Sequence, residues 1–89
     1  MEIRGFEWDQ SNELHIARHN VKIHEAEEVL LATGFLRKTH SGRYGAYGQS
    51  LDGRHLFVVF EKLNGNVVRV ITARDMAARE KRFYRRAAR

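Results

Sequence analysis

A carboxylate stands at an unexpected place in the last part of the chain, residues 75–88. If this stretch is a helix, its apolar side chains form one stripe at about 100° per residue, made of Met76, Phe83, Tyr84 and Ala87. Glu80 falls in the middle of that stripe. A buried carboxylate without a partner costs several kcal/mol or becomes protonated, so we expect Glu80 to pair with a cation.

Three arginines are candidate partners of Glu80: Arg74 at the end of the preceding strand, Arg69 within it, and Arg43 on another strand. Strict alternation places Arg69 and Arg74 on opposite faces of their strand. Two interpretations of the pair are open. It is either a structural ion pair that fixes the helix to the sheet, or an arginine held rigid by a carboxylate, as in a preorganised phosphate site.

The sequence RYGAYGQ combines an arginine with small and aromatic residues on one strand face. Arg43, Gly45, Tyr47 and Gln49 share that face, and Gly45 adds almost no bulk to it. The face is either a shallow concavity suited to a flat base or a phosphate, or a place where glycine eases the curvature of the sheet.

Two histidines, His15 and His19, stand four residues apart, which is the spacing of a two-histidine metal site on a helix. No convincing third ligand follows, so we expect neither a metal nor another cofactor. His19 lies between Arg18 and Lys22, whose positive charges favour a neutral imidazole able to accept a proton. The alternative is a histidine that interacts with the dipole at the C-terminus of its helix.

The charge of the chain is unevenly distributed. Residues 1–33 carry seven acidic and three basic side chains, whereas residues 34–89 carry four acidic and thirteen basic ones. A positive surface of this kind suits a polyanion such as nucleic acid, although it also serves solubility alone. The length of 89 residues predicts a single domain over residues 1–89. The absence of cysteine, of a leader-like N-terminus and of a long apolar run predicts a cytoplasmic protein without membrane attachment.

The first third of the chain predicts a short strand and two helices. Phe6 and Trp8 alternate with polar residues in the strand. The first helix is expected from an N-cap at Asp9 to His19, with Asn20 ending it and an inner face of Leu14, Ala17 and Val21. The second is expected over residues 22–33, with Gly34 as its cap and an inner face of Ile23, Ala26, Leu30 and Thr33.

The remainder predicts an antiparallel meander and a closing helix. Four strands are expected at residues 35–39, 43–50, 55–62 and 66–73. Asp52-Gly53 and Asn64-Gly65 are hairpin signals, and the run LFVVF (56–60) predicts a central strand covered on both faces. The expected fold class is therefore α+β: a short N-terminal strand, two helices, a four-stranded antiparallel meander sheet and a C-terminal basic helix.

The chain also resembles a known family, the BrnT-type toxins, across nearly its whole length. The segments that carry the resemblance occur in that family's order: FEWD (6–9), HIARHNV (15–21), EAEEVL (25–30), RYGAYGQ (43–49), VVRVITAR (67–74) and AREKRFY (78–84). The resemblance implies a fold like that of RelE-like ribonucleases and a role as the toxin of a type II toxin–antitoxin system. It also implies an RNA substrate and a hetero-oligomer with a DNA-binding antitoxin, usually of ribbon-helix-helix type.

The candidate catalytic residues, and Arg18 beside them, follow from the resemblance position by position. Those implied as catalytic are His19, Arg43, Arg74, Glu80 and Tyr84. Those expected to contact nucleic acid are Arg18, Lys22, Tyr47, Arg69, Arg82 and Arg85. The chain departs from the family where Asn20 replaces the usual glycine and Lys22-Ile23 replaces Ser-Phe, which affects the register of the first helix and hence the role of His19.

The expected activity is metal-independent RNA cleavage. A general base takes the proton of a ribose 2′-OH, which attacks the adjacent phosphate while arginines stabilise the developing charge. Arg43 and Arg74 would hold phosphate, Glu80 would orient one of them, and His19 or Tyr84 would transfer protons. One alternative is a non-catalytic nucleic-acid-binding or partner-binding module, and another is an interaction protein whose basic surface docks an acidic segment of the antitoxin.

Overall fold

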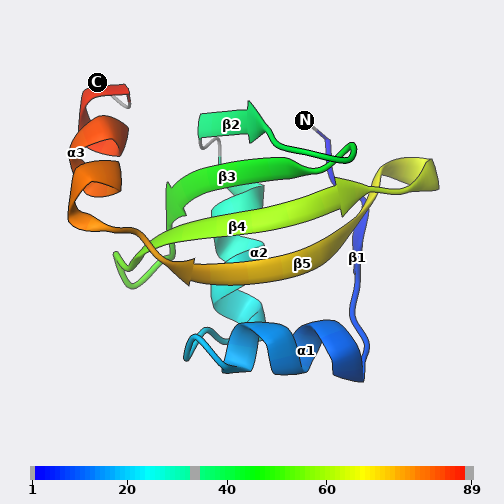
Figure 1. Ribbon diagram of the computed structural model, residues 1–89. Coiled ribbons are helices and arrows are strands. Elements are labelled where there is room, and N and C mark those ends of the chain that lie inside the picture. The colour runs from blue at the N-terminus through cyan, green and yellow to red at the C-terminus, as the bar shows by residue number, and fades with distance from the viewer. Residues whose placement is uncertain (1, 33–34, 88–89) are drawn as a thin grey trace.

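The computed structural model describes residues 2–32 and 35–87 and places five strands in one mixed sheet (Figure 1). The strands are β1 (Gly5–Glu7), β2 (Phe35–Lys38), β3 (Tyr44–Gln49), β4 (His55–Lys62) and β5 (Val67–Asp75). The helices are α1 (Gln10–Ala17), α2 (Ile23–Leu31) and α3 (Ala78–Ala87). The order across the sheet is β1-β5-β4-β3-β2, so β4 is the central strand, as the run LFVVF predicts.

The N-terminal strand changes the expected sheet from four antiparallel strands to five mixed ones. β1 pairs in parallel with β5, from Gly5 opposite Val67 to Glu7 opposite Arg69. The other three pairings are antiparallel, as expected for the meander. A strand of three residues is too short for its sequence to specify a partner, and only the fold supplies one.

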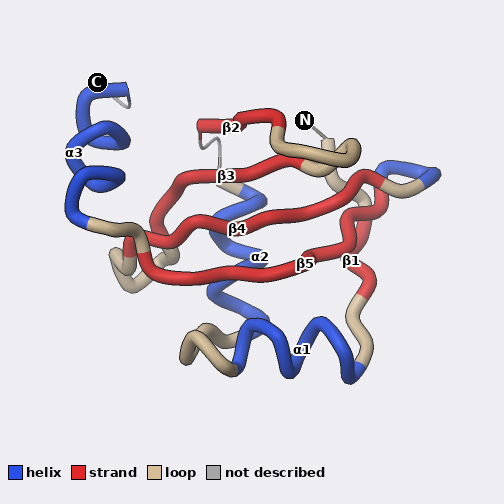
Figure 2. Tube along the Cα trace, in the orientation of Figure 1, coloured by secondary structure: helices blue, strands red, loops and turns tan. Residues whose placement is uncertain are grey.

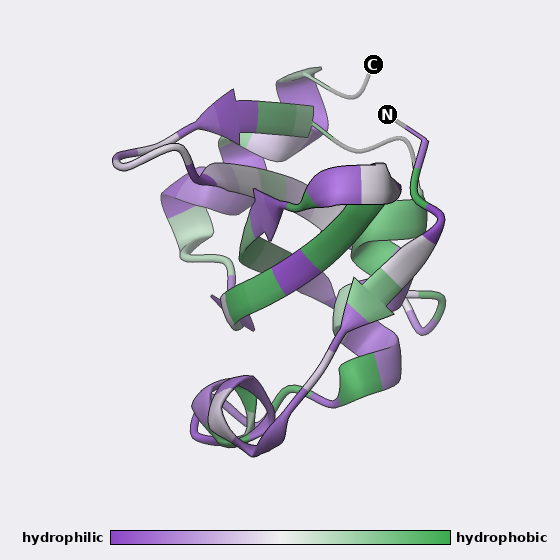
Figure 3. Cartoon of the chain, turned by 90° about the vertical axis from the view of Figure 1, so that its right-hand side faces the viewer, coloured by the Kyte–Doolittle hydropathy of each residue, from purple (hydrophilic) through white to green (hydrophobic). Residues whose placement is uncertain are grey.

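The connections between strands agree with the hairpin signals. Gly53, in the loop between β3 and β4, has φ 86°. The loop between β4 and β5 is a single 3-10 turn, Asn64–Asn66, in which Gly65 has φ 75° (Figure 2). Figure 3 shows hydrophobic stretches in the strands, interrupted by hydrophilic residues. No helix within residues 2–32 or 35–87 is long and apolar enough to cross a membrane.

The core lies between the sheet and two helices. α2 crosses behind the sheet and α1 runs along β5 (Figure 1). The fully buried side chains on β4 are Leu56, Val58 and Phe60, and they pack with Ile16 of α1 and Val29 of α2. Asp9 caps α1 as predicted, and Asn20 has φ 59°, which confirms the expected left-handed break after the first helix.

The inner face of α1 differs from the prediction at Leu14 and Ala17, whereas Val21 is buried as predicted. Asn12 and Ile16 are buried, whereas Leu14 is 55% exposed and Ala17 is also exposed. The side-chain amide of Asn12 donates to the carbonyls of Glu7 and Val70, both at 3.0 Å. It thus supplies a hydrogen-bond donor to the edge of β5 beyond the end of β1. A polar residue thus holds an inward position that apolar spacing did not reveal.

The second helix follows its predicted face more closely. Ala26, Val29 and Leu30 are buried on its inner side, and Ile23 packs against the core. The predicted inner residue Thr33 and the predicted cap Gly34 lie outside the described residues.

The sheet face opposite α1 and α2, here called the open face, is only partly covered. On β4 it carries Phe57, Val59 and Glu61, which are half-buried, so the prediction of two covered faces is wrong. α3 stands beside this sheet at the end where β5 finishes (Figure 1), and among its described residues none is buried. The last helix therefore closes one end of the open face rather than a core.

A β-bulge in β5 brings two arginines to the open face. Val59 lies opposite Thr72, but the next residue, Phe60, lies opposite Val70, so Ile71 is an extra residue. Beyond it, Arg69 lies opposite Glu61, while Arg74 lies opposite Phe57 on the other side of the bulge. Both arginines share the face of their β4 partners, and the predicted opposite placement is wrong because strict alternation assumes no bulge.

Candidate active site

Arg74 and Glu80 form a two-point ion pair at the end of the open face. Arg74 Nη1 donates to Glu80 Oε1 at 2.7 Å and Nη2 donates to Oε2 at 3.0 Å. Glu80 Oε1 also accepts the N–H of Ala77 at 2.7 Å, so the carboxylate caps the start of α3 as well. The predicted pairing of Glu80 is confirmed, and its partner is Arg74 rather than Arg69 or Arg43.

The surroundings keep both members of this pair charged. The hydrogen bond from Arg74, aided by the N–H of Ala77, lowers the pKa of Glu80 to about 2, against the opposing effect of burial. The same hydrogen bond raises the pKa of Arg74 above its ordinary value. Of the five N–H bonds of Arg74, three donate to acceptors among the described residues, Glu80 and the carbonyl of Asp75. The guanidinium is thus a fixed cation with donors left for an anion.

Replacing Glu80 with glutamine tests the acid dependence of this pair. A folded-state pKa of about 2 against an ordinary value of 4.5 means that the ionised pair stabilises the fold above about pH 4.5 and loses this effect as the pH falls toward 2. Glu80→Gln should therefore lower the free energy of unfolding by about 1–2 kcal/mol at pH 7 and by much less near pH 2.5.

Urea unfolding at several pH values measures this difference. Glu61→Gln is the matched control, because Glu61 accepts one bond from Arg43 in a more exposed pair. An equal loss for Glu80→Gln at pH 7 and pH 2.5 would contradict the assigned ionisation.

The guanidinium of Arg74 contacts one ring of a group of aromatic side chains. Its Cζ lies 4.9 Å from the ring centre of Phe57, which is the geometry of a cation–π contact. The Phe57 ring is 4.6 Å from Tyr47, and the Phe83 ring is 5.1 Å from Phe35 and 6.0 Å from Tyr47. We call Phe35, Tyr47, Phe57 and Phe83 the aromatic cluster.

Gly45 is the residue that makes room for the cluster. A Cβ at Gly45 would lie 2.5 Å from Cε1 of Phe57, so the ring of Phe57 crosses β3 where the side chain is missing. The concavity predicted over Gly45 is therefore filled by Phe57. Tyr47 shares the face as predicted and is the buried member of the cluster.

A pocket of about 280 Å³ opens beside the ion pair. Its lining comes from three elements: Arg37, Tyr47, Arg79, Glu80 and Phe83. Phe83 is 41% exposed and Phe35, its neighbour, is 39% exposed. The lining thus combines the carboxylate that holds Arg74, one exposed ring and two cations.

A histidine that the sequence did not single out lies on the same face. His55 occupies the same side of β4 as Phe57, two residues away, and its ring is 5.7 Å from that of Tyr84, edge to face. Burial, and then the charges of Arg85 and Lys81, lower the pKa of His55 below 6.5. His55 is therefore a neutral imidazole at pH 7, available to accept a proton.

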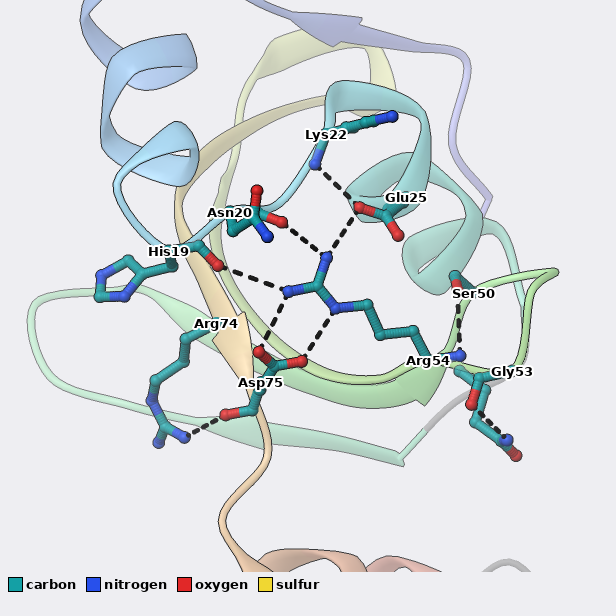
Figure 4. Close-up of polar contacts among 10 residues, drawn as sticks. His19, Asn20, Lys22, Glu25, Ser50, Gly53, Arg54, Arg74 and Asp75 are labelled. Carbon is teal, nitrogen blue, oxygen red and sulfur yellow. Dashed lines mark hydrogen bonds and ion pairs between the residues drawn. The ribbon is translucent and has the colours of Figure 1, made fainter.

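Arg54, which precedes β4, links the end of β5 to the loop between α1 and α2 and to α2 itself (Figure 4). Its Nε and Nη2 donate to the two carboxylate oxygens of Asp75 at 2.9 and 3.0 Å, and Nη1 donates to Glu25 at 3.0 Å. It also donates to the carbonyls of Asn20 at 2.7 Å and His19 at 3.4 Å. We call these contacts the Arg54 network. Sequence reasoning missed this network, because its members come from three distant segments.

Of the other predicted catalytic residues, Tyr84 stands one turn after Glu80 on α3, whereas Arg43 lies away from the Arg74–Glu80 pair. Arg43 donates to Glu61 at 3.2 Å, four residues along β4 from Phe57 and hence roughly 13 Å from the position of Arg74. The side chain of His19 is exposed in the loop after α1, and its carbonyl is bound by Arg54.

The residues predicted to contact nucleic acid spread over several surfaces. Arg69 is bound by Glu7 and Asp9 beside Arg43, at the far end of the open face. The exposed ones lie at the end of α1, at the start of α2 and on α3: Arg18, Lys22, Arg82 and Arg85. Within residues 2–32 and 35–87, no three His, Cys, Asp or Glu side chains gather as metal ligands would.

Comparisons with known proteins give one family and one fold. A family model described as the ribonuclease toxin BrnT of type II toxin–antitoxin systems matches residues 8–80. Among solved structures, the chain is similar to the ribonuclease toxin BrnT of Brucella abortus, with a TM-score of 0.67 and 21% identity. The match covers 82% of this chain and 96% of that one, and at this identity it shows a shared fold. No curated protein matches the chain.

Proposed function

Since the chain belongs to the BrnT family of type II toxin–antitoxin ribonuclease toxins, we propose that it cleaves RNA at the Arg74 end of its open face. The observation that carries this proposal is the two-point pair of Arg74 and Glu80, with Arg74 stacked on Phe57 and bordered by a pocket. An arginine fixed in this way is preorganised to bind a phosphate and the charge that develops on it.

The reaction is attack of a ribose 2′-OH on the adjacent phosphate, which breaks the bond from phosphorus to the 5′ oxygen of the next nucleotide. The products are a 2′,3′-cyclic phosphate and a 5′-OH, whose oxygen takes up a proton as it leaves. Arg74 stabilises the charge on the phosphate oxygens, and Glu80 positions Arg74 without touching the substrate. The proton of the 2′-OH passes to the His55–Tyr84 pair, in which His55 is neutral and within ring contact of Tyr84. His19 remains the alternative acceptor, on the strength of the family resemblance. Arg43 and Arg69 bind phosphates further along the RNA strand.

Because arginines supply the stabilising charge, the reaction is expected to proceed without a metal ion. Incubation of the purified protein with RNA in EDTA should give products that end in a 2′,3′-cyclic phosphate. Retention of intact RNA under conditions where the protein is folded and binds RNA would reject the catalytic proposal. The partner expected from the resemblance is a DNA-binding antitoxin of ribbon-helix-helix type in a hetero-oligomer, and the RelE-like relationship and cytoplasmic action belong to the same proposal.

A non-catalytic binding module is the second candidate. It is favoured by the exposed cations of α3, which extend beyond the open face. Such a module would bind RNA or an acidic antitoxin segment with a steep dependence on salt and would form no product. Co-expression with the neighbouring reading frame and co-purification would identify the partner in either case.

A further inference from the structure

The pocket beside Arg74 has features that phosphate binding alone does not require. Phe83 and Phe35 expose 41% and 39% of their surfaces although both rings belong to the aromatic cluster. Large exposed apolar side chains that gather in one place mark a binding surface. Neither ring contributes to a core, since no described residue of α3 or β2 is buried.

Two arginines flank these rings. Arg37 comes from the edge strand β2 and Arg79 from the first turn of α3, and both line the pocket with Phe83. Both are exposed, and no carboxylate among the described residues pairs with either. Aromatic faces next to unpaired arginines bind single-stranded RNA, because the rings stack on bases while the cations meet the flanking phosphates.

We propose that this pocket is a nucleobase subsite, in which one base of single-stranded RNA stacks on Phe83 between Arg37 and Arg79, next to the phosphate held by Arg74. The inference rests on the proposed function for its ligand, and it adds the element that positions the strand. A volume of about 280 Å³ suits one flat ring system. The base neighbouring the reacting phosphate would then fix the register of the strand.

Binding of an oligonucleotide that cannot be cleaved tests the subsite apart from catalysis. The probe is a fluorescein-labelled, mixed-sequence 2′-O-methyl oligonucleotide, titrated at several salt concentrations and followed by anisotropy. Phe83→Ala should weaken binding by roughly 5- to 100-fold with no change in the salt slope, because stacking releases no counterions. Arg79→Ala should weaken binding and reduce the slope by about 0.7, the value for one phosphate contact on a single strand.

Three controls make the result specific. Arg86→Ala, on the same helix and outside the pocket lining, should reduce binding less than Arg79→Ala. Phe83→Tyr should keep the affinity of the unaltered chain, since it keeps the ring. With an oligonucleotide of abasic sites, Phe83→Ala and the unaltered chain should bind equally, because no base is present to stack.

Unchanged binding by Phe83→Ala, or an equal loss with abasic and normal oligonucleotides, would overturn the subsite. If Phe83→Ala instead loses only a co-expressed antitoxin, the patch belongs to the antitoxin and the proposal fails. Cleavage of ordinary RNA is a separate readout. If the chain cleaves RNA and Phe83→Ala changes neither cleavage nor binding, the subsite alone is rejected. If binding depends on stacking but no RNA is cleaved, the catalytic proposal alone is rejected.

Discussion

Arg74→Ala is expected to slow RNA cleavage by about 100- to 1000-fold, the usual cost of removing one preorganised donor from the charge that develops in a transition state. Arg74 meets the requirement because Glu80 fixes two of its nitrogens and Phe57 lies under its plane. The measurement is the rate of cleavage of labelled RNA in EDTA under single-turnover conditions. Product release does not limit the rate under these conditions.

Two matched variants separate chemistry from folding. Arg74→Lys keeps a cation near Glu80 but loses the planar fork, so it should recover stability while remaining slow. Arg43→Ala removes a cation whose bond to Glu61 is roughly 13 Å away, and should slow cleavage by no more than about tenfold. A rate for Arg74→Ala within about threefold of the original, in a folded protein, would move the reaction elsewhere.

The largest expected effect on stability comes from Arg54→Leu. Arg54 has five N–H bonds, and acceptors among the described residues receive all five. Its removal leaves the Glu25 carboxylate, whose side chain is 9% exposed, without its cation. Breaking a buried pair from one side costs about 3–5 kcal/mol, and since Arg54 is 24% exposed we expect about 2–4 kcal/mol.

Unfolding of Arg54→Leu and Arg82→Leu in guanidinium chloride compares an arginine of the Arg54 network with an exposed arginine. Arg82→Leu should change the free energy of unfolding by less than about 0.5 kcal/mol. Adding Glu25→Gln to Arg54→Leu should recover part of the loss, because the uncompensated charge is gone. A loss below about 1 kcal/mol for Arg54→Leu is the size expected of an exposed ion pair. Such a loss would show that solvent already satisfies Glu25.

Much of the backbone was predictable because it follows from local chemistry. β4 has the predicted bounds, Asp9 caps the first helix, and Asn20 takes the left-handed conformation. The Glu80 pair was predictable because a charge within an apolar stripe demands a partner. Each of these signals lies within a few residues of the feature that it predicts.

The missed features depend on contacts between distant segments. A bulge at Ile71 leaves the composition of β5 unchanged, so the face of Arg69 could not be settled by alternation. Asn12 and Arg54 look like ordinary surface residues until their acceptors are known. Phe57 was assigned to a covered strand, whereas it lies over Gly45 and under Arg74.

The parallel pairing of β1 with β5 has a consequence for the order of events during synthesis. Residues 5–7 are made early, but their partners are residues 67–69, and the amide of Asn12 also awaits Val70. Contacts between such distant residues form late, because the chain between them must first be closed. A nascent chain that has reached β4 still lacks one edge of its sheet, and the strand that completes this edge also brings Arg74. The last edge of the sheet and the strand end that carries Arg74 are therefore expected to take their places together, once β5 has been made.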